Sequence, residues 1–349
     1  MHRRVALIKA IPPGARRNAG IAAAQIHSVA RILEPRVASA FLAAIKNIKS
    51  TVTLASLARA IERGDIEDVL AILGVRELAK RMAGAGLEPG ATTFQNEIIE
   101  SFRRGGAAGM SQLPRRAALQ ASLDLTNPEA VRYLSLNLPT SIREITDETV
   151  RAVQQSLMRG FNEGRPAAKI AREIRGVVGL TEAQAGAVGN FRHQLETGDM
   201  GTMTAPWDRR LSATERAQAR RIFTSGGARG GQTDALVARY EQSLINRRAK
   251  NIARTEVTRA FGAGQAELWG QAEEQGLLAG AKTRRHWLVT RDERSRKQHR
   301  AVPGMNPDGV GLHEPFQTPI GPVDQPRESG DAGFDINCRC TVYLEIEDA

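Results

Sequence analysis

The 349-residue chain has two cysteines, Cys338 and Cys340, which lie one residue apart near its C-terminal end. Side chains two apart on a strand point to the same face, so CRCTVYLEIE predicts a final strand with one apolar face. That face comprises Cys338, Cys340, Val342, Leu344 and Ile346. Free cysteines often serve as small buried apolar side chains, so the pattern favours two core cysteines.

A metal site is the main alternative for these two thiols. Two thiolates on one face can share a zinc ion with His299, because zinc takes sulfur and nitrogen ligands in a tetrahedron. His286, His313 or Asp292 would then supply the fourth ligand. Cys-x-Cys is a weaker metal signal than Cys-x-x-Cys, and a redox or intermolecular role for the cysteines is a third interpretation.

A long helix is expected upstream of the cysteines, from Ser243 to about Gln275. It carries a stripe of mostly small side chains, which permits the close approach of another backbone. The stripe consists of Ala249, Ala253, Val257, Ala260, Gly264 and Leu268. Glu256 lies on or beside this stripe, where burial of a carboxylate requires a compensating cation, so we expect an arginine partner from another segment.

The pattern changes after Gly280. RHWLVT (285–290) has strand composition, and TRDE (290–293) is a capping box that predicts a short helix with Arg294, Arg296 and His299. Residues 301–336 then contain six prolines and six glycines. A loop of this length in a compact domain is usually functional or held in place by side chains.

The first 125 residues predict a series of helices. Proline disfavours helical geometry in the residue before it, so a helix at 21–33 should end before Pro35. Further helices are expected at 36–49, 66–82 and 93–102. The glycine-rich segment 103–116 predicts a flexible basic linker.

The middle of the chain has clear helix start and stop signals. Asn127 followed by Pro128 predicts one helix start, Thr146 another and Pro166 a third. Capping boxes at 181–184 and 212–215 predict two more helices, which would end near Gly198 and Gly226. The sequence therefore predicts a mainly α protein with a helical N-terminal region (1–125), a helical array (126–242) and a small α+β module (243–349).

Charge is unevenly distributed along a chain whose net charge is +11. Residues 1–50 carry nine Lys and Arg against one acidic residue, and residues 201–300 carry twenty against ten. Residues 301–349 carry two against nine. The basic segments favour contact with a polyanion, although no aromatic residues are interleaved to support base stacking.

Compartment and membrane signals are few. Cysteine scarcity favours a reducing compartment. The N-terminal MHRRVALIKAIPPG lacks the apolar stretch of a secretory signal, and no window offers the roughly 18 apolar residues of a membrane helix. The sequence predicts a soluble protein made in a cytoplasm.

Several motifs together resemble one protein family. These are ARTEVTRAFGAGQ (253–265), HWLVTRDERSRKQHRAV (286–302), EPF (314–316) and INCRC (336–340), with similar helices at 145–188. In order and spacing they resemble the Mu F-like minor head proteins of tailed bacteriophages, also called phage head morphogenesis proteins. The resemblance covers roughly residues 130–345.

The resemblance implies a structural virion protein and not an enzyme. It implies association with the portal protein and with the major capsid or scaffolding protein, and non-specific phosphate contacts with packaged double-stranded DNA. The protein would be located inside the head near the portal, and in the host cytoplasm during assembly, without a membrane or cofactor. The family motif falls on Arg254, Thr255, Glu256, Trp287, Asp292, Arg294, Arg296, His299, Asn337, Cys338 and Cys340. Within this motif, we expect Arg294 or Arg296 to pair with Glu256.

Two other functions compete with this interpretation. Asp292, His299 and the cysteines can be arranged as a metal-dependent nuclease or toxin-like active site. The sequence contains no H-E-x-x-H, nucleophile elbow or phosphate-cradling glycine loop to support an enzyme. The basic segments alternatively indicate a non-specific DNA-binding protein, whose affinity would depend steeply on salt.

Overall fold

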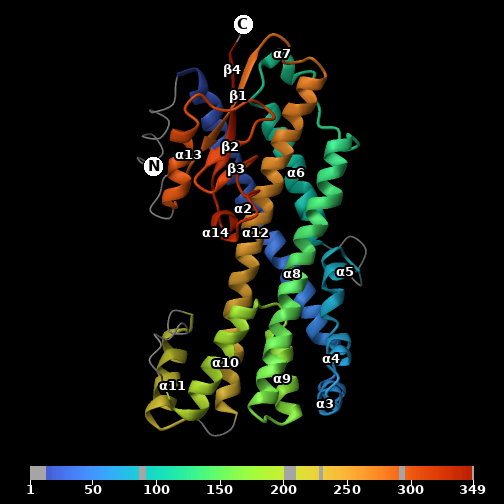
Figure 1. Cartoon of the computed structure of the whole chain (residues 1–349), viewed down its shortest axis with the longest axis vertical. Coiled ribbons are helices and arrows are strands. Elements are labelled where there is room, and N and C mark those ends of the chain that lie inside the picture. Colours follow the sequence, from blue (N-terminus) through green and yellow to red (C-terminus); the bar gives the residue numbers. More distant parts are fainter. Residues whose placement is uncertain (1–12, 86–91, 200–209, 228–230, 291–294, 348–349) are drawn as a thin grey trace. The chain divides into compact units, whose positions relative to one another are not determined.

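The computed structural model describes residues 13–85, 92–199, 210–227, 231–290 and 295–347. These residues are mainly helical, with small two-stranded sheets in the C-terminal part (Figure 1). They group into two compact units. Unit 1 contains the described residues of 1–38, 92–138 and 250–349, and unit 2 those of 39–91 and 139–249. Both units are built from interleaved segments of the chain. The division into three consecutive regions that the sequence suggested therefore stays a prediction.

Three long helices contribute residues to both units. They are α2 (Pro13–Thr51), α8 (Pro128–Asn162) and α12 (Gln232–Glu274). The predicted break before Pro35 is wrong, because α2 continues through this proline. An interior proline costs about 3 kcal/mol. Burial of Leu33 and Val37 on either side of Pro35 offsets that cost, so the helix continues.

Helix α6 (Phe94–Met110) packs closely against α12 in unit 1. A Cβ atom on Gly264 would lie 1.9 Å from the Phe102 carbonyl oxygen, and one on Gly105 would lie 2.0 Å from that of Phe261. The small-residue stripe on α12 therefore allows the close backbone approach that was predicted. The flexible linker expected at 103–116 is wrong at its start, because residues 103–110 belong to α6 and glycine is required there by packing.

Most of the remaining helices form unit 2. They are α3 (Leu54–Glu62), α4 (Ile66–Leu73), the 3-10 helix η1 (Val75–Glu77), α5 (Leu78–Met82), α9 (Ala167–Val177), α10 (Glu182–Thr197) and α11 (Ala213–Thr224). Both predicted capping boxes are present, from Thr181 to Gln184 and from Ser212 to Glu215. The single helix expected at 66–82 is interrupted at Gly74, which adopts a left-handed conformation.

Helix α8 begins as expected but continues further than expected. The Glu129 amide donates to Asn127 Oδ1 at 2.9 Å, which confirms the cap before Pro128. Thr146 was expected to start a new helix, but it lies inside α8 and donates its hydroxyl to the Ile142 carbonyl at 2.9 Å. Threonine can satisfy its hydroxyl on the preceding turn, so a cap-forming residue is compatible with a helix interior.

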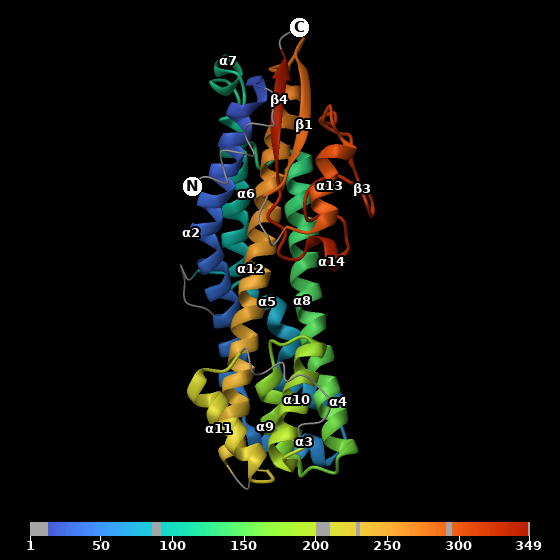
Figure 2. The same ribbon diagram turned by 90° about the vertical axis from the view of Figure 1, so that its left-hand side faces the viewer.

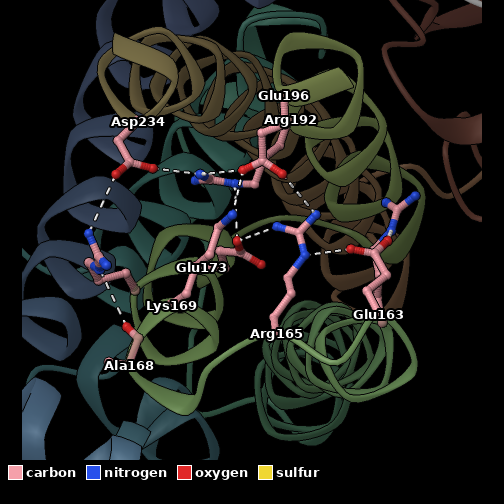
Figure 3. A network of polar contacts seen from close by, with 10 residues as sticks. Glu163, Arg165, Ala168, Lys169, Glu173, Arg192, Glu196 and Asp234 are labelled. Carbon is pink, nitrogen blue, oxygen red and sulfur yellow. Dashed lines mark hydrogen bonds and ion pairs between the residues drawn. The ribbon is translucent and has the colours of Figure 1, made fainter. Parts of the chain in front are cut away.

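An ionic network connects the helices of unit 2 (Figure 3). Arg165 donates to Glu173 at 2.6 Å and to Glu163 at 2.5 Å, and Arg192 donates to Asp234 at 2.5 Å. We use "ionic network" for Glu163, Arg165, Lys169, Glu173, Arg192, Glu196 and Asp234. The two arginines are less than one-tenth exposed, whereas the Asp234 side chain is about half exposed, so the network runs from the interior of unit 2 to its surface.

The C-terminal part of unit 1 is built on two antiparallel strands, β1 (Lys282–Leu288) and β4 (Thr341–Glu347). One face of this sheet packs on α2, where Ala15, Ala19 and Ala22 meet Leu288 and Tyr343. The other face packs against α13 (Lys297–Met305), the hairpin β2 (Phe316–Thr318) and β3 (Gly321–Val323), and α14 (Ala332–Asp335). Figure 2 shows the strands between α2 and α13. The helix α7 (Arg115–Ala118) completes the unit.

Candidate metal centre

The two cysteines lie in the turn that leads into β4, and not inside the strand as predicted. They are 2% and 3% exposed and belong to the same apolar cluster as Val342 and Leu344. The predicted apolar face therefore continues into this turn. The core position expected for the cysteines is confirmed by their burial.

His299 meets both cysteines from the first turn of α13. Its Nδ1 atom lies 3.4 Å from the Cys338 sulfur and 3.4 Å from the Cys340 sulfur. The three ligand atoms lie within 4.8 Å of one another, and all three side chains are buried. We call His299, Cys338 and Cys340 the cysteine centre.

The geometry of the cysteine centre fits zinc. Tetrahedral zinc with bonds of about 2.3 Å to sulfur and about 2.0 Å to nitrogen places these atoms about 3.5 Å apart. The observed nitrogen–sulfur separations of 3.4 Å match this value. His299 Nε2 is buried without a hydrogen-bond partner among the described residues. It can carry the proton while Nδ1 remains a ligand.

A small cavity opens beside the cysteine centre. Besides the three ligand residues, it is lined by Thr290, Ser295, Arg296, Asn337 and Arg339. Three ligands from the described residues leave one tetrahedral position to be filled. The cavity borders the side from which a fourth group can approach.

Aromatic side chains fix the histidine ring. The Phe334 ring centre lies 4.2 Å from that of His299, and the Trp287 ring lies edge-on at 6.5 Å. Trp287 also packs edge-on against Phe316 at 5.4 Å. The motif tryptophan therefore acts as a packing surface behind the metal-ligand candidates.

A buried arginine completes the surroundings of the thiols. Arg327 is 1% exposed and donates to the Cys340 carbonyl at 2.6 Å and to the Thr258 carbonyl at 2.7 Å. The same guanidinium lies 4.0 Å from the Cys338 sulfur. Hydrogen bonds from Cys340 and His299, with the charge of Arg327, hold the pKa of Cys338 well below its ordinary value despite burial. Cys338 is thus the thiol more readily ionised.

The turn before the cysteines is held from two sides. Arg296 donates to the carbonyls of Phe334 at 3.1 Å and Ile336 at 2.6 Å. The Asn337 amide donates to the Thr255 hydroxyl of α12 at 3.2 Å, and Asn337 itself has a left-handed backbone, with φ 59°. Asparagine tolerates this conformation better than most residues, which accounts for its place in the turn.

Two of the three predicted fourth ligands, His286 and His313, are not at the cysteine centre. His286 pairs with Glu345 at 2.7 Å on the sheet, and His313 pairs with Glu273 at 2.7 Å. Neither belongs to the metal-compatible cluster found among the described residues. Asp292 and Arg294 lie outside the described residues, so the predictions made for them are untested.

Glu256 has an arginine neighbour on its own helix, and the pairing expected with Arg294 is untested because Arg294 lies outside the described residues. Arg259 donates from Nη1 to both carboxylate oxygens of Glu256 at 3.1 Å. Its Nε donates to the Arg327 carbonyl at 2.8 Å, which links the pair to the loop. Arg296 is instead engaged with the turn before the cysteines. This i, i+3 pair on one helix face supplies a cation beside the buried carboxylate.

Arg254, the other motif arginine on α12, reaches toward the same turn. Its side chain lies 3.5 Å from Asn337 Oδ1 and 3.5 Å from Glu34 of α2. The motif residues Arg254, Thr255, Asn337 and the cysteine centre are therefore brought together in unit 1. The family motif marks a contact between α12 and the last turn of the chain.

The sequence did not predict the role of two arginines, Arg327 and Arg285, which donate to backbone carbonyls around the cysteine centre and its neighbouring loop. Arg285 donates to the carbonyls of Gly311, Asp324 and Glu314 at 3.2, 3.1 and 2.5 Å. Burial lowers its pKa to about 10. The available signal was the long Pro/Gly-rich loop, whose carbonyls need donors that the loop does not supply itself.

Comparison with known proteins gives a family. The model of the Phage Mu protein F like protein family matches residues 151–343, more than half of the chain. The chain belongs to the Mu F-like family. Membership indicates a bacteriophage head morphogenesis protein, and with it a place in the phage head.

One curated relative carries the name of an enzyme. The Mu F-like chain is 31% identical over 121 residues to the NAD(+)--arginine ADP-ribosyltransferase EFV of Enterococcus faecalis. The match covers 34% of this chain and 23% of that protein, so the chain spans less than a quarter of this relative. No solved structure gives a significant match. None of the described helices is long and apolar enough to cross a membrane.

Proposed function

We propose that this Mu F-like protein is a minor component of the phage head that associates with the portal protein during procapsid assembly. The observation that carries the proposal is the family match over residues 151–343, which includes the cysteine centre and its supports on α12. The partners would be the portal protein and the major capsid or scaffolding protein. The interior of the head near the portal would be its final location.

Co-expression tests the portal association. We expect the full chain to co-purify with the portal protein of the same phage, and to bind the major capsid protein alone less well. A double substitution Gly105→Leu and Gly264→Leu provides a poorly folded control, because both glycines meet backbone atoms across α6 and α12. Failure of the folded chain to bind the portal protein, or its absence from virions, would contradict the proposal.

The cysteine centre would serve this function as a structural zinc site. Bound zinc would cross-link α13 to the turn before β4 and stabilise unit 1, since structural zinc contributes directly to folding. Cys338, Cys340 and His299 would hold it, while Arg327 and the rings of Trp287 and Phe334 maintain their positions. The donor set of two sulfurs and one nitrogen supports zinc over magnesium or calcium, which prefer oxygen.

Metal analysis tests this site. We expect about one zinc per purified chain, lost in Cys338→Ser and in His299→Ala. His286→Ala is the matched control, because His286 belongs to the same unit but bonds to Glu345. Equal zinc content in all variants, or none in the wild-type protein, would reject the metal and leave the cysteines as core side chains.

We also propose that the protein contacts packaged DNA through non-specific phosphate interactions. The net charge of +11 and the excess of arginine in residues 201–300 support this part of the proposal. The affinity should fall steeply with salt and depend little on sequence, because phosphate contacts release counterions and do not distinguish bases. Sequence-independent binding that persists unchanged at high salt would contradict it.

No enzymatic activity is part of the proposal. The match to the ADP-ribosyltransferase covers 34% of this chain and 23% of that protein, so it does not carry the enzyme's activity to this chain. Incubation with labelled NAD+ and arginine-containing acceptors tests this directly. We expect no transfer of label, and transfer that requires the intact chain would replace the structural role with an enzymatic one.

A further inference from the structure

Arg327 has an unusual backbone conformation inside unit 1. It lies in the loop of residues 325–330, which we call the arginine loop. Its φ of 78° falls in the left-handed region, which a bulky residue rarely adopts, and the residue is only 1% exposed. Such a conformation persists only where surrounding contacts enforce it, and a buried guanidinium also needs partners. The contacts of Arg327 must therefore offset both costs.

Contacts on one side seat the arginine loop on α12. The Arg327 guanidinium donates from Nη2 to the Thr258 carbonyl at 2.7 Å, and the Arg327 carbonyl accepts from Arg259 Nε at 2.8 Å. Gly262, one turn further along α12, leaves room for this approach. A Cβ atom on Gly262 would lie 3.2 Å from Gln325 Oε1 and 3.6 Å from Arg327 Nη2. A larger side chain at Gly262 would therefore push the loop off the helix.

Contacts on the other side join the same guanidinium to the cysteine centre. Arg327 Nη1 donates to the Cys340 carbonyl at 2.6 Å and lies 4.0 Å from the Cys338 sulfur. Zinc held by both sulfurs and His299 would fix Cys340, and with it the carbonyl that accepts from Arg327. The guanidinium is a rigid plane, so a shift of Nη1 also moves Nη2 away from Thr258. The position of Arg327 therefore depends on both contacts at once.

We propose that zinc binding at the cysteine centre and seating of the arginine loop on α12 are coupled through Arg327. This inference rests on the proposed zinc site and states what the metal regulates. Coupling is reciprocal, so a zinc ion that favours the seated loop is itself bound more tightly when the loop is seated, by the same factor. The metal content of the cysteine centre would then set how firmly the loop covers this face of α12.

A second loop of the same unit provides an internal comparison. Residues 308–314 are held by Arg285, which is also buried and donates to the carbonyls of Gly311 and Glu314 at 3.2 and 2.5 Å. None of the hydrogen bonds that Arg285 makes with described residues reaches the cysteine centre or α12. General loosening of the module would affect both loops, whereas coupling through Arg327 would affect the arginine loop alone.

Hydrogen exchange of the full wild-type chain, with zinc and after its removal by a chelator, tests the effect of the metal on the loop. The amides of Glu328, Ser329 and Gly330 are hydrogen-bonded, so their exchange reports the order of the arginine loop. We expect about tenfold faster exchange there without zinc, and a much smaller change in residues 308–314. Equal changes in the two loops, or no change in the arginine loop, would overturn the coupling.

Zinc affinity, measured by competition with a chelator, tests the reciprocal effect from α12. We expect Gly262→Leu to weaken zinc binding about tenfold, although residue 262 contacts none of the three ligand residues. Gly270→Leu is the matched control on the same helix, because a Cβ there would meet only His313, at 3.9 Å, and it should leave the affinity unchanged.

The outcomes separate this inference from the zinc site on which it rests. If the wild-type chain binds no zinc, the zinc site is wrong and the coupling with it. If zinc binds equally well to Gly262→Leu and Gly270→Leu, the zinc site stands and the coupling is wrong. Circular dichroism melts show whether each variant is folded. If Gly262→Leu does not fold, the exchange of the wild-type chain decides.

Discussion

Buried arginines stabilise each of the two units internally, but the chemical groups that accept their hydrogen bonds differ between the units. In the C-terminal part of unit 1, Arg285 and Arg327 donate to backbone carbonyls of loops and turns. In unit 2, Arg165 and Arg192 donate to carboxylates of the ionic network. Helices use their own carbonyls internally, whereas an irregular loop leaves many without donors. Arginine therefore supplies missing backbone donors in one region and pairs with clustered carboxylates in the other.

This difference predicts that the arginine contacts of the two regions respond differently to pH. A carbonyl does not titrate, so the arginine contacts of unit 1 should persist from acid to neutral conditions. The carboxylates of unit 2 must be ionised to keep their partners, and Glu163 and Asp234 accordingly have lowered pKa values, where hydrogen bonds and charges of arginine outweigh burial. The following substitutions test this contrast, from the largest expected effect to the smallest.

Arg327→Met should have the largest effect. It leaves the carbonyls of Cys340 and Thr258 buried without their donor, and we expect the free energy of unfolding to fall by about 3–5 kcal/mol. Urea denaturation measures this loss. Arg300→Met is the exposed control and should change stability by less than about 0.5 kcal/mol. Similar values for the two variants would show that carbonyl bonding does not hold unit 1.

Close backbone packing in unit 1 is tested by Gly264→Ala. Its Cβ would lie 1.9 Å from the Phe102 carbonyl oxygen, and a loss of about 1–3 kcal/mol is expected because the backbone cannot easily move. The matched change in unit 2 is Gly176→Ala, whose Cβ would lie 2.6 Å from the Glu241 carboxylate. That side chain can shift, so thermal denaturation should show a smaller loss. The reverse order would argue that α6 and α12 can separate.

The ionic network is tested by Arg192→Met. This change removes the donor to Asp234 and the contact with Glu173 at 3.3 Å, although Arg165 still serves Glu173. We expect a loss of about 1–2 kcal/mol. Hydrogen exchange should show faster amide exchange in α9 and α10 than in α13. Equal acceleration throughout both units would contradict their separate stabilisation.

The smallest effect is a pH dependence at Glu241. Burial raises the pKa of this carboxyl from 4.5 to about 7, opposed by the charge of Lys49. Between these two values the folded protein keeps a proton that the unfolded chain has lost, so stability falls as pH rises through the window. Denaturation across pH should show a smaller fall in Glu241→Gln than in the wild-type protein, because burial also raises the pKa of Glu328 to about 7 and this residue contributes a similar fall to both proteins.

Glu163→Gln supplies a control of opposite sign for that measurement. The folded-state pKa of Glu163 is lowered, so its contribution is present above the unfolded value and is lost as pH falls through the folded one. The wild-type protein should therefore exceed Glu163→Gln in stability near neutral pH and lose this advantage in acid. An unchanged difference across pH would mean that the network does not depend on ionisation.

Local signals predicted much of the fold. The capping boxes at Thr181 and Ser212, the Asn127 cap and the small-residue stripe of α12 were all identified from neighbouring residues in the sequence. The errors occurred where distant packing overrides local preference. Pro35 and Thr146 lie inside long helices because burial against other helices outweighs the cost of a proline or the preference for a cap.

The sequence predicted only part of the candidate site. The type and spacing of Cys338, Cys340 and His299 were sufficient to group them, and the structure brings their ligand atoms within 4.8 Å. His286 and His313 offered the same chemistry but are held elsewhere by glutamates, which no spacing rule shows. Arg327 resembled an ordinary loop cation in sequence. Its role depends on a fold that surrounds it with unsatisfied carbonyls.

The interleaving of segments affects how the protein can fold during its synthesis on the ribosome. Strand β1 pairs with β4, and the face of α2 formed by Ala15, Ala19 and Ala22 packs on Leu288 and Tyr343 of these two strands. This face of α2 therefore lacks its contacts with the sheet until residue 343 has been synthesised. Nascent chains that stop before residue 341 should expose this face of α2 and the unpaired edge of β1, and host chaperones or proteases should recognise them.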